Sequence, residues 1–439
     1  MTEPVSPLQS ARRRAGGLAS VGGLARTGAA WGVVGLAVII PFYRHTKSLE
    51  ELFVYGSVGV VLLTALVGWL RDAPEGAGVR IRGGVLIWPI ALAVATAAVS
   101  VVFSMARDAS AAEFRKQILS FVMAYLAALN LMTDERWRRR AFWAFFLGGL
   151  AAAGFGIVAY YTETAVDAGR ALGPAQSYTR SAMYFILWTP LMLAGLLEGA
   201  PANRWPRALV LIGIAMGWWL VVLTQTRGAM AVILLSTLAL AAHRHWRWGA
   251  GLLIVSLLLA ASVPSFRGRC LTTVRNLSDP NALLSDRLKL WRMAREVIAE
   301  HPLAGIGYGS EIFQQKAVRA RYPMFNYKYQ PHAHSFYLQA PCESGVLHLA
   351  GLLAFFAGFL VLAARGLGAS GGRRPAGIDR AIVVGVFAGV ASMLVYGVVG
   401  HFHERRVAMM MWYLIGLACA ALTSARPPDS GPRVAGPRR

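Results

Sequence analysis

The chain has 439 residues, of which 56% are hydrophobic and 15% charged, and its formal net charge is +23. Soluble globular proteins carry about 25% charged residues, so this composition excludes a soluble domain and indicates an integral membrane protein. The apolar runs are about 20 residues long without alternation, which favours spanning helices over the roughly ten-residue alternating strands of a barrel. We therefore expect an all-α polytopic membrane protein.

About twelve transmembrane helices are expected. Residues 1–26 lack the apolar core of a signal peptide and predict a disordered cytoplasmic tail, and residues 425–439 predict a second cytoplasmic tail. Nine spans are expected within 27–263 and three within 343–424, on either side of a large loop over 264–342. The predicted spans are 27–43, 51–70, 84–104, 112–132, 141–161, 181–199, 206–226, 228–242, 249–263, 343–364, 381–400 and 407–424.

The arginines are scattered between the spans and form no single stripe, so the net charge does not indicate a nucleic-acid partner. They follow the positive-inside rule, under which cytoplasmic loops are enriched in Lys and Arg. This bias places both termini in the cytoplasm and the loop 264–342 outside. The arginine-rich segments are 12–26, 71–82, 136–140, 204–207, 244–247, 365–380 and 426–439.

The three cysteines leave the redox chemistry open. Cys270 and Cys342 fall on the expected outer side, and Cys419 lies in the last predicted span. An oxidising compartment permits a disulfide between Cys270 and Cys342. Two unpaired cysteines are equally compatible with the sequence, which does not give their separation.

Two outer loops are candidates for function, a small one over 162–180 and the large one over 264–342. In the large loop, Ser285 and Asp286 predict the start of a helix. Pro302 and the glycines that follow predict its end and a tight backbone turn. The apolar face expected for this helix consists of Leu288, Trp291, Ala294 and Ile298.

Two arginines are candidate anion ligands. Arg227 lies at the outer end of the seventh span, where an ionised residue either faces a partner or extends its side chain to the lipid headgroups. Arg287 lies in the first turn of the predicted helix, which favours phosphate binding, although a solvated helix face or a pair with Asp286 is also compatible. Eleven Lys and Arg oppose five acids between 264 and 340, which fits a phosphate-bearing substrate.

Several histidines lie at the outer side. His334 stands where the large loop returns to the membrane, with His332 two residues before it, and a neutral imidazole suits a general base near pH 7. A purely structural role is the alternative. In another outer loop, His401, His403 and Arg405 either approach His334 or contact lipid headgroups.

The sequence lacks the motifs of several common reaction types. The sequence contains no acidic cluster for a divalent metal beside a phosphate, no P-loop and no Ser or Cys nucleophile motif. We therefore expect no metal or other cofactor, and we expect arginines to supply the positive charge for a phosphate leaving group.

Three local motifs carry a resemblance to a known family. Thr226-Arg227-Gly228 looks like a Ser/Thr-Arg-Gly motif at a span end, and the helix from Arg287 followed by residues 302–307 (Pro-Leu-Ala-Gly-Ile-Gly) looks like an amphipathic helix with a Pro-Leu-x-Gly-x-Gly motif. His334-Ser335, nine residues and Gly345 look like a His-Asn/Ser/Gln-x9-Gly motif. Three places after the glycine, that motif usually has another small residue or Tyr, whereas this sequence has His348. With the overall plan of spans and one large loop, the chain resembles the O-antigen ligases (WaaL type), within the superfamily of bacterial O-antigen ligases and polymerases.

The resemblance implies a metal-independent inverting glycosyl transfer that forms lipopolysaccharide. A glycan on undecaprenyl pyrophosphate would move onto a sugar hydroxyl of lipid A-core, at the periplasmic face of the bacterial inner membrane. His334 would be the general base, and Arg227 and Arg287 would bind the pyrophosphate. Weaker candidates for substrate binding are Arg170, Arg180 and Arg295.

Two alternatives stay open. An O-antigen polymerase or a protein O-oligosaccharyltransferase would use the same lipid-linked donor with another acceptor. A lipid-linked glycan transporter is less consistent with the sequence, because the notable charges lie at the outer face and not along a path through the spans, and because we find no internal repeat.

Overall fold

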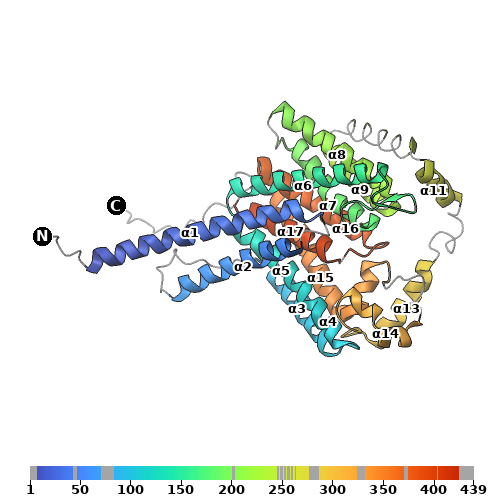
Figure 1. Cartoon of the computed structure of the whole chain (residues 1–439), viewed down its shortest axis with the longest axis horizontal. Coiled ribbons are helices and arrows are strands. Elements are labelled where there is room, and N and C mark those ends of the chain that lie inside the picture. Colours follow the sequence, from blue (N-terminus) through green and yellow to red (C-terminus); the bar gives the residue numbers. More distant parts are fainter. Residues whose placement is uncertain are drawn as a thin grey trace, which may run out of the picture.

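The described part of the chain is a helical bundle with one small hairpin (Figure 1). The computed structural model describes residues 7–42, 47–70, 84–199, 203–244, 264–275, 286–323, 332–369, 374–402 and 404–424, with single positions between 247 and 262. Six described helices are long and apolar enough to cross a membrane, which agrees with an all-α membrane protein. They are α6 (Glu135–Tyr161), α7 (Tyr178–Leu197), α8 (Arg204–Thr224), α15 (Phe336–Gly368), α16 (Gly377–Tyr396) and α17 (Arg405–Ser424).

The other elements complete the bundle and its loops. Strands β1 (Val166–Asp167) and β2 (Arg170–Ala171) pair antiparallel, with Val166 opposite Ala171. The remaining helices are α1 (Pro7–Ile39), α2 (Lys47–Leu70), α3 (Ile87–Val102), α4 (Arg107–Lys116), α5 (Ile118–Leu131), α9 (Arg227–Arg244), α11 (Pro264–Arg275), α13 (Asp286–Glu300), α14 (Lys316–Arg321) and the 3-10 helix η1 (Ser310–Gln314).

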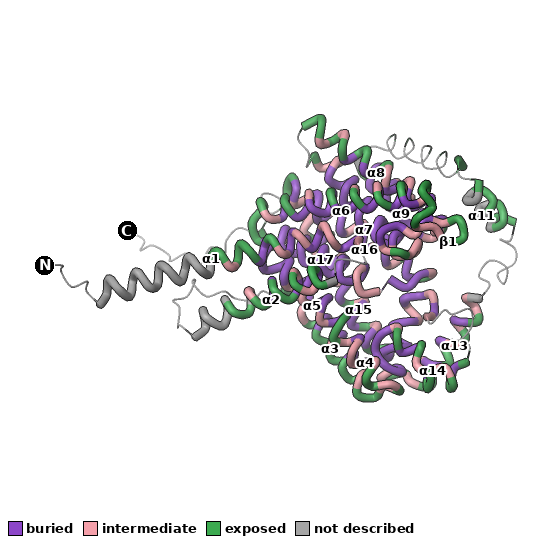
Figure 2. Tube along the Cα trace, viewed as in Figure 1, coloured by how far each residue is buried: buried purple, intermediate pink, exposed green. Residues whose placement is uncertain are grey.

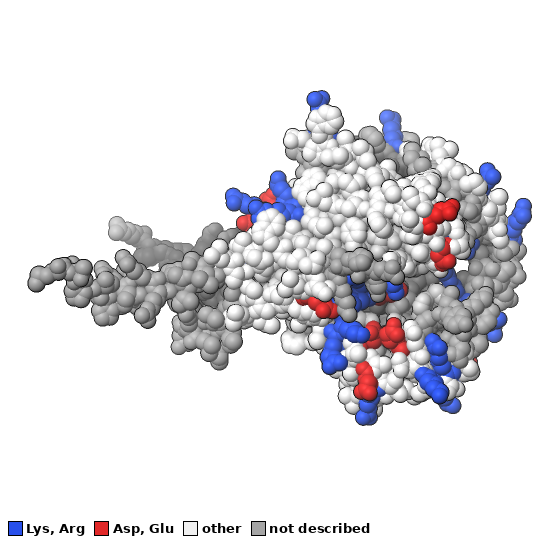
Figure 3. Space-filling model, viewed as in Figure 1, with Lys and Arg blue, Asp and Glu red and all other residues white. Residues whose placement is uncertain are grey.

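The core lies in the middle of the bundle, where α7 packs along α16 and α5 along α17. Helices α7 and α17 are buried on nearly all sides, which is expected of central helices (Figure 2). Helices α13 and α14 form a lobe at one end, far from the start of α1. On the face shown in Figure 3, many charged side chains gather over the lower lobe and the right-hand side, and a largely uncharged surface covers much of the upper part of the bundle.

Several boundaries differ from the sequence predictions. Helix α1 begins at Pro7, so residues 7–26 are helical and not a disordered tail. The span predicted over 112–132 is divided at Gln117 into α4 and α5. Residues 336–342, assigned to the loop, belong to α15. The span predicted over 249–263 lies mostly outside the described residues.

The apolar face of α13 is also rotated from the prediction. The fully buried residues are Leu290, Ala294 and Val297, which pack in a cluster formed by the large loop itself. Of the predicted face, only Ala294 is fully buried, because neighbours in the tertiary structure select the covered side of a helix. Cys342 joins the same cluster as a free thiol, which donates a hydrogen bond to the Ala294 carbonyl at 3.3 Å, whereas the side chain of Cys270 lies outside the described residues.

Helix α15 is broken at Ser344 and Gly345, whose backbone angles are not helical. The break releases the Cys342 carbonyl and the Val346 N–H from each other. The Cys342 carbonyl instead accepts from the Ile306 N–H at 2.9 Å, and the Val346 N–H donates to the Pro302 carbonyl at 2.8 Å. The segment 302–307 thus packs against the break through backbone hydrogen bonds.

Two glycines make this close approach possible. A Cβ on Gly305 would lie 2.4 Å from the Glu343 carbonyl carbon, and a Cβ on Gly345 would lie 2.0 Å from the Leu303 carbonyl oxygen. Both glycines also have positive φ, of 64° and 79°. The two sequence motifs that contain these glycines therefore form one structural unit.

We predict that Gly345→Ala prevents stable folding of the loop and of α15, because the added methyl group would overlap the Leu303 carbonyl. Gly377→Ala is the matched control, since Gly377 also has positive φ, of 54°, but a Cβ there would meet nothing within 4 Å. The control should cost about 1 kcal/mol. Thermal unfolding of both purified variants measures this, and similar midpoints for the two would contradict the prediction.

Candidate functional site

Histidines gather where the large loop returns to the bundle. The ring centroids of His332 and His334 lie 4.0 Å apart, and those of His332 and His401 lie 6.0 Å apart. His401 lies between α16 and α17 and is buried. The structure thus brings together three of the four predicted histidines, while His403 lies outside the described residues.

The backbone at His334 is left-handed, with φ of 51°. This conformation costs an L-residue about 1 to 2 kcal/mol and persists where surrounding contacts impose it. On the C-terminal side these contacts are the hydrogen bonds of the Phe336 N–H with the carbonyls of Gly397 and Gly400, at 2.8 and 3.0 Å. The loop between α16 and α17 therefore fixes where the histidine side chain leaves the backbone.

Both histidines of the loop are neutral near pH 7. Burial, the neighbouring His332 and the Arg287 charge lower the pKa of His334 from 6.5 to about 3. Burial, Arg180 and Arg287 lower the pKa of His332 to about 4. A neutral imidazole accepts a proton, so the electrostatics keep His334 in the state that a general base requires.

The two predicted anion ligands lie within electrostatic range of each other. Burial lowers the pKa of Arg287, the hydroxyl of Tyr396 opposes that shift, and the Arg227 charge adds to it. Arg227 is the first residue of α9 and is exposed. Arginine stays protonated in proteins, so Arg287 brings a positive charge to the neutral histidines, and Arg227 brings a second within electrostatic range of Arg287.

Arg170 supports the start of α9. Its Nε donates to the Thr224 carbonyl at 2.8 Å, at the end of α8, and its guanidinium lies 3.3 Å from the ring centroid of Tyr178. The Thr224 carbonyl is one of those that a helix end leaves without an intrahelical partner. Arg170 therefore holds the small loop against the junction that presents Arg227.

Arg180 lies at the same end of the bundle. It pairs with Glu404 in the loop before α17 and lowers the pKa of His332. Tyr396, at the end of α16, packs against Gly228, where an added Cβ would lie 3.3 Å from the tyrosine ring. This contact explains the glycine that follows Arg227.

Two predicted substrate ligands are placed elsewhere. Arg295 is exposed on α13, eight residues and about 12 Å along the helix from Arg287, and it forms no ion pair within the described residues. Arg405 pairs with Glu50 at 3.1 Å and with Glu51 at 3.5 Å, so it joins α17 to the start of α2. Neither arginine is brought to His334 by a described contact.

The arrangement suits transfer from a phosphate leaving group to a hydroxyl. A neutral imidazole is available to take a proton, and nearby arginines are available to hold developing negative charge. Within the described part of the chain, no group of three or more His, Cys, Asp or Glu side chains is arranged to hold a metal ion.

Comparison with known proteins agrees with this chemistry. Residues 208–356 match the O-antigen ligase family. This match supports membership of the O-antigen ligase superfamily. No curated protein matches the sequence. The matched region contains Arg227, Arg287 and His334, and it supports an activity of the O-antigen ligase or polymerase type on lipid-linked glycans.

Sequence reasoning missed several polar residues of this O-antigen ligase domain and its surroundings. Gln339 and Glu343 fall inside the nine-residue spacer of the histidine motif, and both are buried in the structure. Two polar residues spaced by one helical turn, in an otherwise apolar span, could have indicated them. Tyr396 carried no comparable signal, because an aromatic residue at the end of a span is common.

His348, the departure from the family motif, is accommodated within the bundle. It is buried, its Nδ1 lies 2.9 Å from the Ala93 carbonyl, and its ring packs edge-on against Tyr308, with centroids 5.9 Å apart. The residue therefore bridges α3 and the glycine turn of the large loop.

We predict that stability falls as the pH drops from 7.5 to 5.0, and that His334→Asn reduces this loss. In the unfolded chain histidine takes up a proton below pH 6.5, whereas folded His334, with its pKa near 3, stays neutral. Its contribution is therefore complete above pH 6.5 and is reduced by about 2 kcal/mol at pH 5. Asparagine tolerates the left-handed backbone and does not titrate. Thermal midpoints in detergent at both pH values test this, and an equal loss in both proteins would contradict it.

Proposed function

We propose that this protein is an O-antigen ligase, which transfers a glycan from undecaprenyl pyrophosphate onto a sugar hydroxyl of lipid A-core. The active site would face the periplasm from the bacterial inner membrane. One observation carries the proposal: the neutral, half-buried His334 lies within electrostatic range of Arg287, which is itself within range of Arg227.

The reaction follows from these groups. His334 accepts the proton of the acceptor hydroxyl, and the hydroxyl oxygen forms a bond with the anomeric carbon of the donor glycan. The bond between that carbon and the pyrophosphate oxygen breaks, and the electron pair leaves with the pyrophosphate. Arg227 and Arg287 stabilise the charge that the leaving group gains. Direct attack inverts the anomeric carbon, and the donor bond supplies the free energy.

The charge of a bound substrate would also change the basicity of His334. With a pKa near 3, His334 is a weak proton acceptor in the free protein, and part of that depression comes from the charge of Arg287. A bound pyrophosphate would neutralise this charge and favour the protonated imidazole. The histidine thus becomes a stronger base when the donor is in place, and the proton then has an anion nearby to receive it.

A ligase and a polymerase differ in the molecule that accepts the glycan. The family match supports ligase or polymerase-type transfer without distinguishing them, and a polymerase would add the same glycan to another lipid-linked glycan. The sequence resemblance and the single large loop favour lipid A-core as the acceptor.

We expect the purified protein to transfer glycan from undecaprenyl pyrophosphate to lipid A-core in the presence of EDTA. His334→Asn should lower kcat about 100-fold or more, since it removes the base. Arg287→Gln should lower kcat/KM by a similar factor, since it removes charge from the leaving-group site. Arg292→Gln is the matched control, an exposed arginine on the same helix α13.

The products decide between outcomes. Full transfer by His334→Asn would exclude His334 as the base, and equal effects of the Arg287 and Arg292 variants would exclude a specific pyrophosphate site at Arg287. A donor glycan that lengthens, while lipid A-core stays unmodified, would assign the protein as a polymerase.

A further inference from the structure

The carboxamide of Gln339 joins the histidine turn to the break in α15. The Ala333 N–H donates to Gln339 Oε1 at 2.7 Å, and Gln339 Nε2 donates to Glu343 Oε1 at 2.6 Å. A backbone N–H only donates, so the atom that accepts from Ala333 is the amide oxygen, and the amide nitrogen is left to donate to Glu343. Gln339 and Glu343 are 0% and 3% exposed, so water does not replace either hydrogen bond.

Glu343 extends this network to the glycine turn of the large loop. Its second carboxylate oxygen accepts from the Gly309 N–H at 3.2 Å, and its backbone carbonyl accepts from the Gly307 N–H at 3.1 Å and from the Ser100 hydroxyl at 2.6 Å. The residue is therefore anchored at the break by its backbone and directs both carboxylate oxygens to fixed donors.

The hydrogen bond of Ala333 restrains the backbone next to His334. Its side chain is fully buried in the cluster of the large loop, so its N–H requires a protein acceptor. The acceptor, Gln339, fixes the peptide between His332 and Ala333, while Gly397 and Gly400 fix the peptide between Ser335 and Phe336. The left-handed His334 therefore lies between two backbone positions that hydrogen bonds fix, and such restraints are what allow a strained conformation to persist.

We propose that Gln339 and Glu343 are positioning residues, which hold His334 in the orientation needed for proton transfer. The inference rests on the proposed function, in which His334 is the base. Glu343 accepts a hydrogen bond from Gln339 Nε2 and thereby supports the amide orientation in which Oε1 faces Ala333. Neither residue touches substrate in this scheme.

Gln339→Leu and Gln339→Glu test the inference. The leucine variant should lower kcat about 10- to 100-fold, because a small misplacement of a catalytic group costs that much. The Kd for undecaprenyl pyrophosphate should stay within about twofold, because Arg227 and Arg287 are unchanged. Tyr337→Phe is the control, since it removes a 2.8 Å hydrogen bond from α15 to the Leu394 carbonyl without involving Ala333.

The glutamate variant adds a readout that a merely structural role would not move. Two neighbouring buried carboxylates at 339 and 343 share one proton at acidic pH, which restores the hydrogen bond between them, and repel each other when both are ionised. The ratio of variant to wild-type kcat should therefore fall as the pH rises from 6 to 9, while the ratio for Tyr337→Phe stays constant.

The outcomes separate the inference from the proposed function. Absence of transfer by wild type would remove the proposed function itself. Transfer by wild type, together with unchanged kcat in Gln339→Leu or a pH-independent ratio in Gln339→Glu, would overturn the positioning role alone. Thermal midpoints identify any variant that fails to fold. If Gln339→Leu fails to fold, the pH dependence of kcat in Gln339→Glu, starting from pH 6, provides the test of the positioning role.

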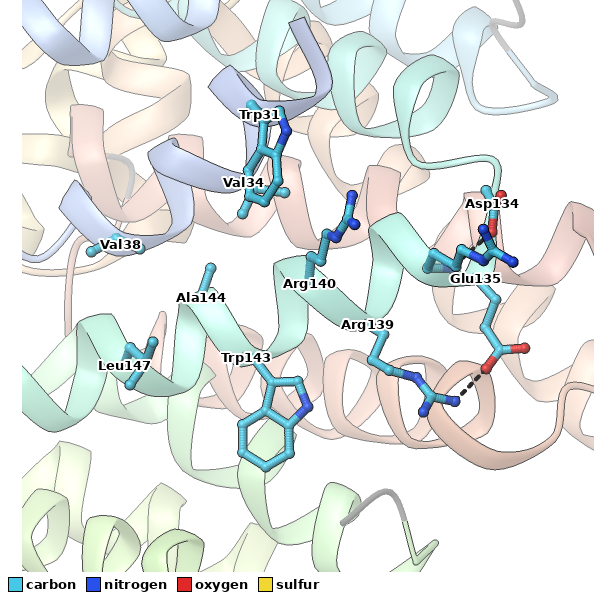
Figure 4. A pocket seen from close by; sticks show the side chains of 11 residues that line it. Trp31, Val34, Val38, Asp134, Glu135, Arg139, Arg140, Trp143, Ala144 and Leu147 are labelled. Atoms are coloured by element: carbon cyan, nitrogen blue, oxygen red, sulfur yellow. Dashed lines mark hydrogen bonds and ion pairs between the residues drawn. The ribbon is translucent and has the colours of Figure 1, made fainter. Parts of the chain in front are cut away.

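A second, independent observation concerns a groove of about 800 Å³ between α1 and α6, at the end of the bundle that we expect to face the cytoplasm (Figure 4). Arginines line one end of the groove, and apolar side chains line the rest. In Figure 4, Arg140 points toward Trp31. The apolar part includes Val34, Val38 and Leu147.

The Arg140 guanidinium is placed to bind an anion in the groove. Its guanidinium lies 4.9 Å from the ring centroid of Trp31 and 4.5 Å from that of Trp137, and it forms no ion pair within the described residues. The two acids of the groove are engaged otherwise. Asp134 accepts from the Arg136 N–H at 2.8 Å as the N-cap of α6, and Glu135 pairs with Arg139 at 2.6 Å.

The geometry points to a binding site for an anionic phospholipid of the cytoplasmic leaflet. The lipid phosphate would lie at Arg140, at the depth of the headgroups, and an acyl chain would follow Val34, Val38 and Leu147 toward the membrane centre. Basic side chains next to a membrane span attract anionic lipids in this way, and the two indoles hold the guanidinium in place.

Thermal unfolding of the delipidated protein in detergent tests the site. Added dioleoylphosphatidylglycerol should raise the midpoint more than dioleoylphosphatidylcholine does, and Arg140→Gln should abolish this difference. Arg204→Gln is the matched control, because Arg204 lies near Trp205 at the expected cytoplasmic start of α8, outside the groove. Equal shifts with both lipids in wild type, or an undiminished difference in Arg140→Gln, would overturn the site.

Discussion

The candidate functional site depends on the backbone groups that the break in α15 releases. A continuous helix would join the Cys342 carbonyl to the Val346 N–H, but both groups bond to the segment 302–307 of the large loop instead. A polar backbone group left unpaired in an apolar interior is costly. The loop therefore has one position in which it satisfies the broken helix, and that position also presents Glu343 to the glycine turn.

Charge compensation divides the arginines into two groups. Arg405 pairs with Glu50 and Glu51, and Arg180 pairs with Glu404, so these side chains join elements of the bundle. Arg227 and Arg287 lie within electrostatic range of each other, and under the proposed function a bound anionic substrate would relieve this repulsion. Burial and the Arg287 charge keep His332 and His334 neutral. This charge distribution supports the proposed binding of a pyrophosphate at the candidate site.

Much of this organisation was predictable from local sequence. Apolar run length predicted the six described helices that are long and apolar enough to cross a membrane. The motifs around Arg227, Arg287 and His334 contain residues that the structure brings within electrostatic range. The boundaries were less accurate. The division at Gln117 and the start of α15 at Phe336 lie inside continuous patterns, where hydropathy alone does not mark a turn or a break. The covered face of α13 also depended on neighbours distant in the sequence.

The sequence by itself determined an all-α membrane protein and the chemical types at its candidate site, because hydrophobic length and local charge are properties of short segments. Only the tertiary structure decided which polar groups meet. The hydrogen bonds from Ala333 to Gln339 and from Gly309 to Glu343 join the histidine turn, α15 and the large loop. Such partners are selected by burial, since a polar group removed from water requires a partner wherever the fold supplies one. No local pattern encodes that choice.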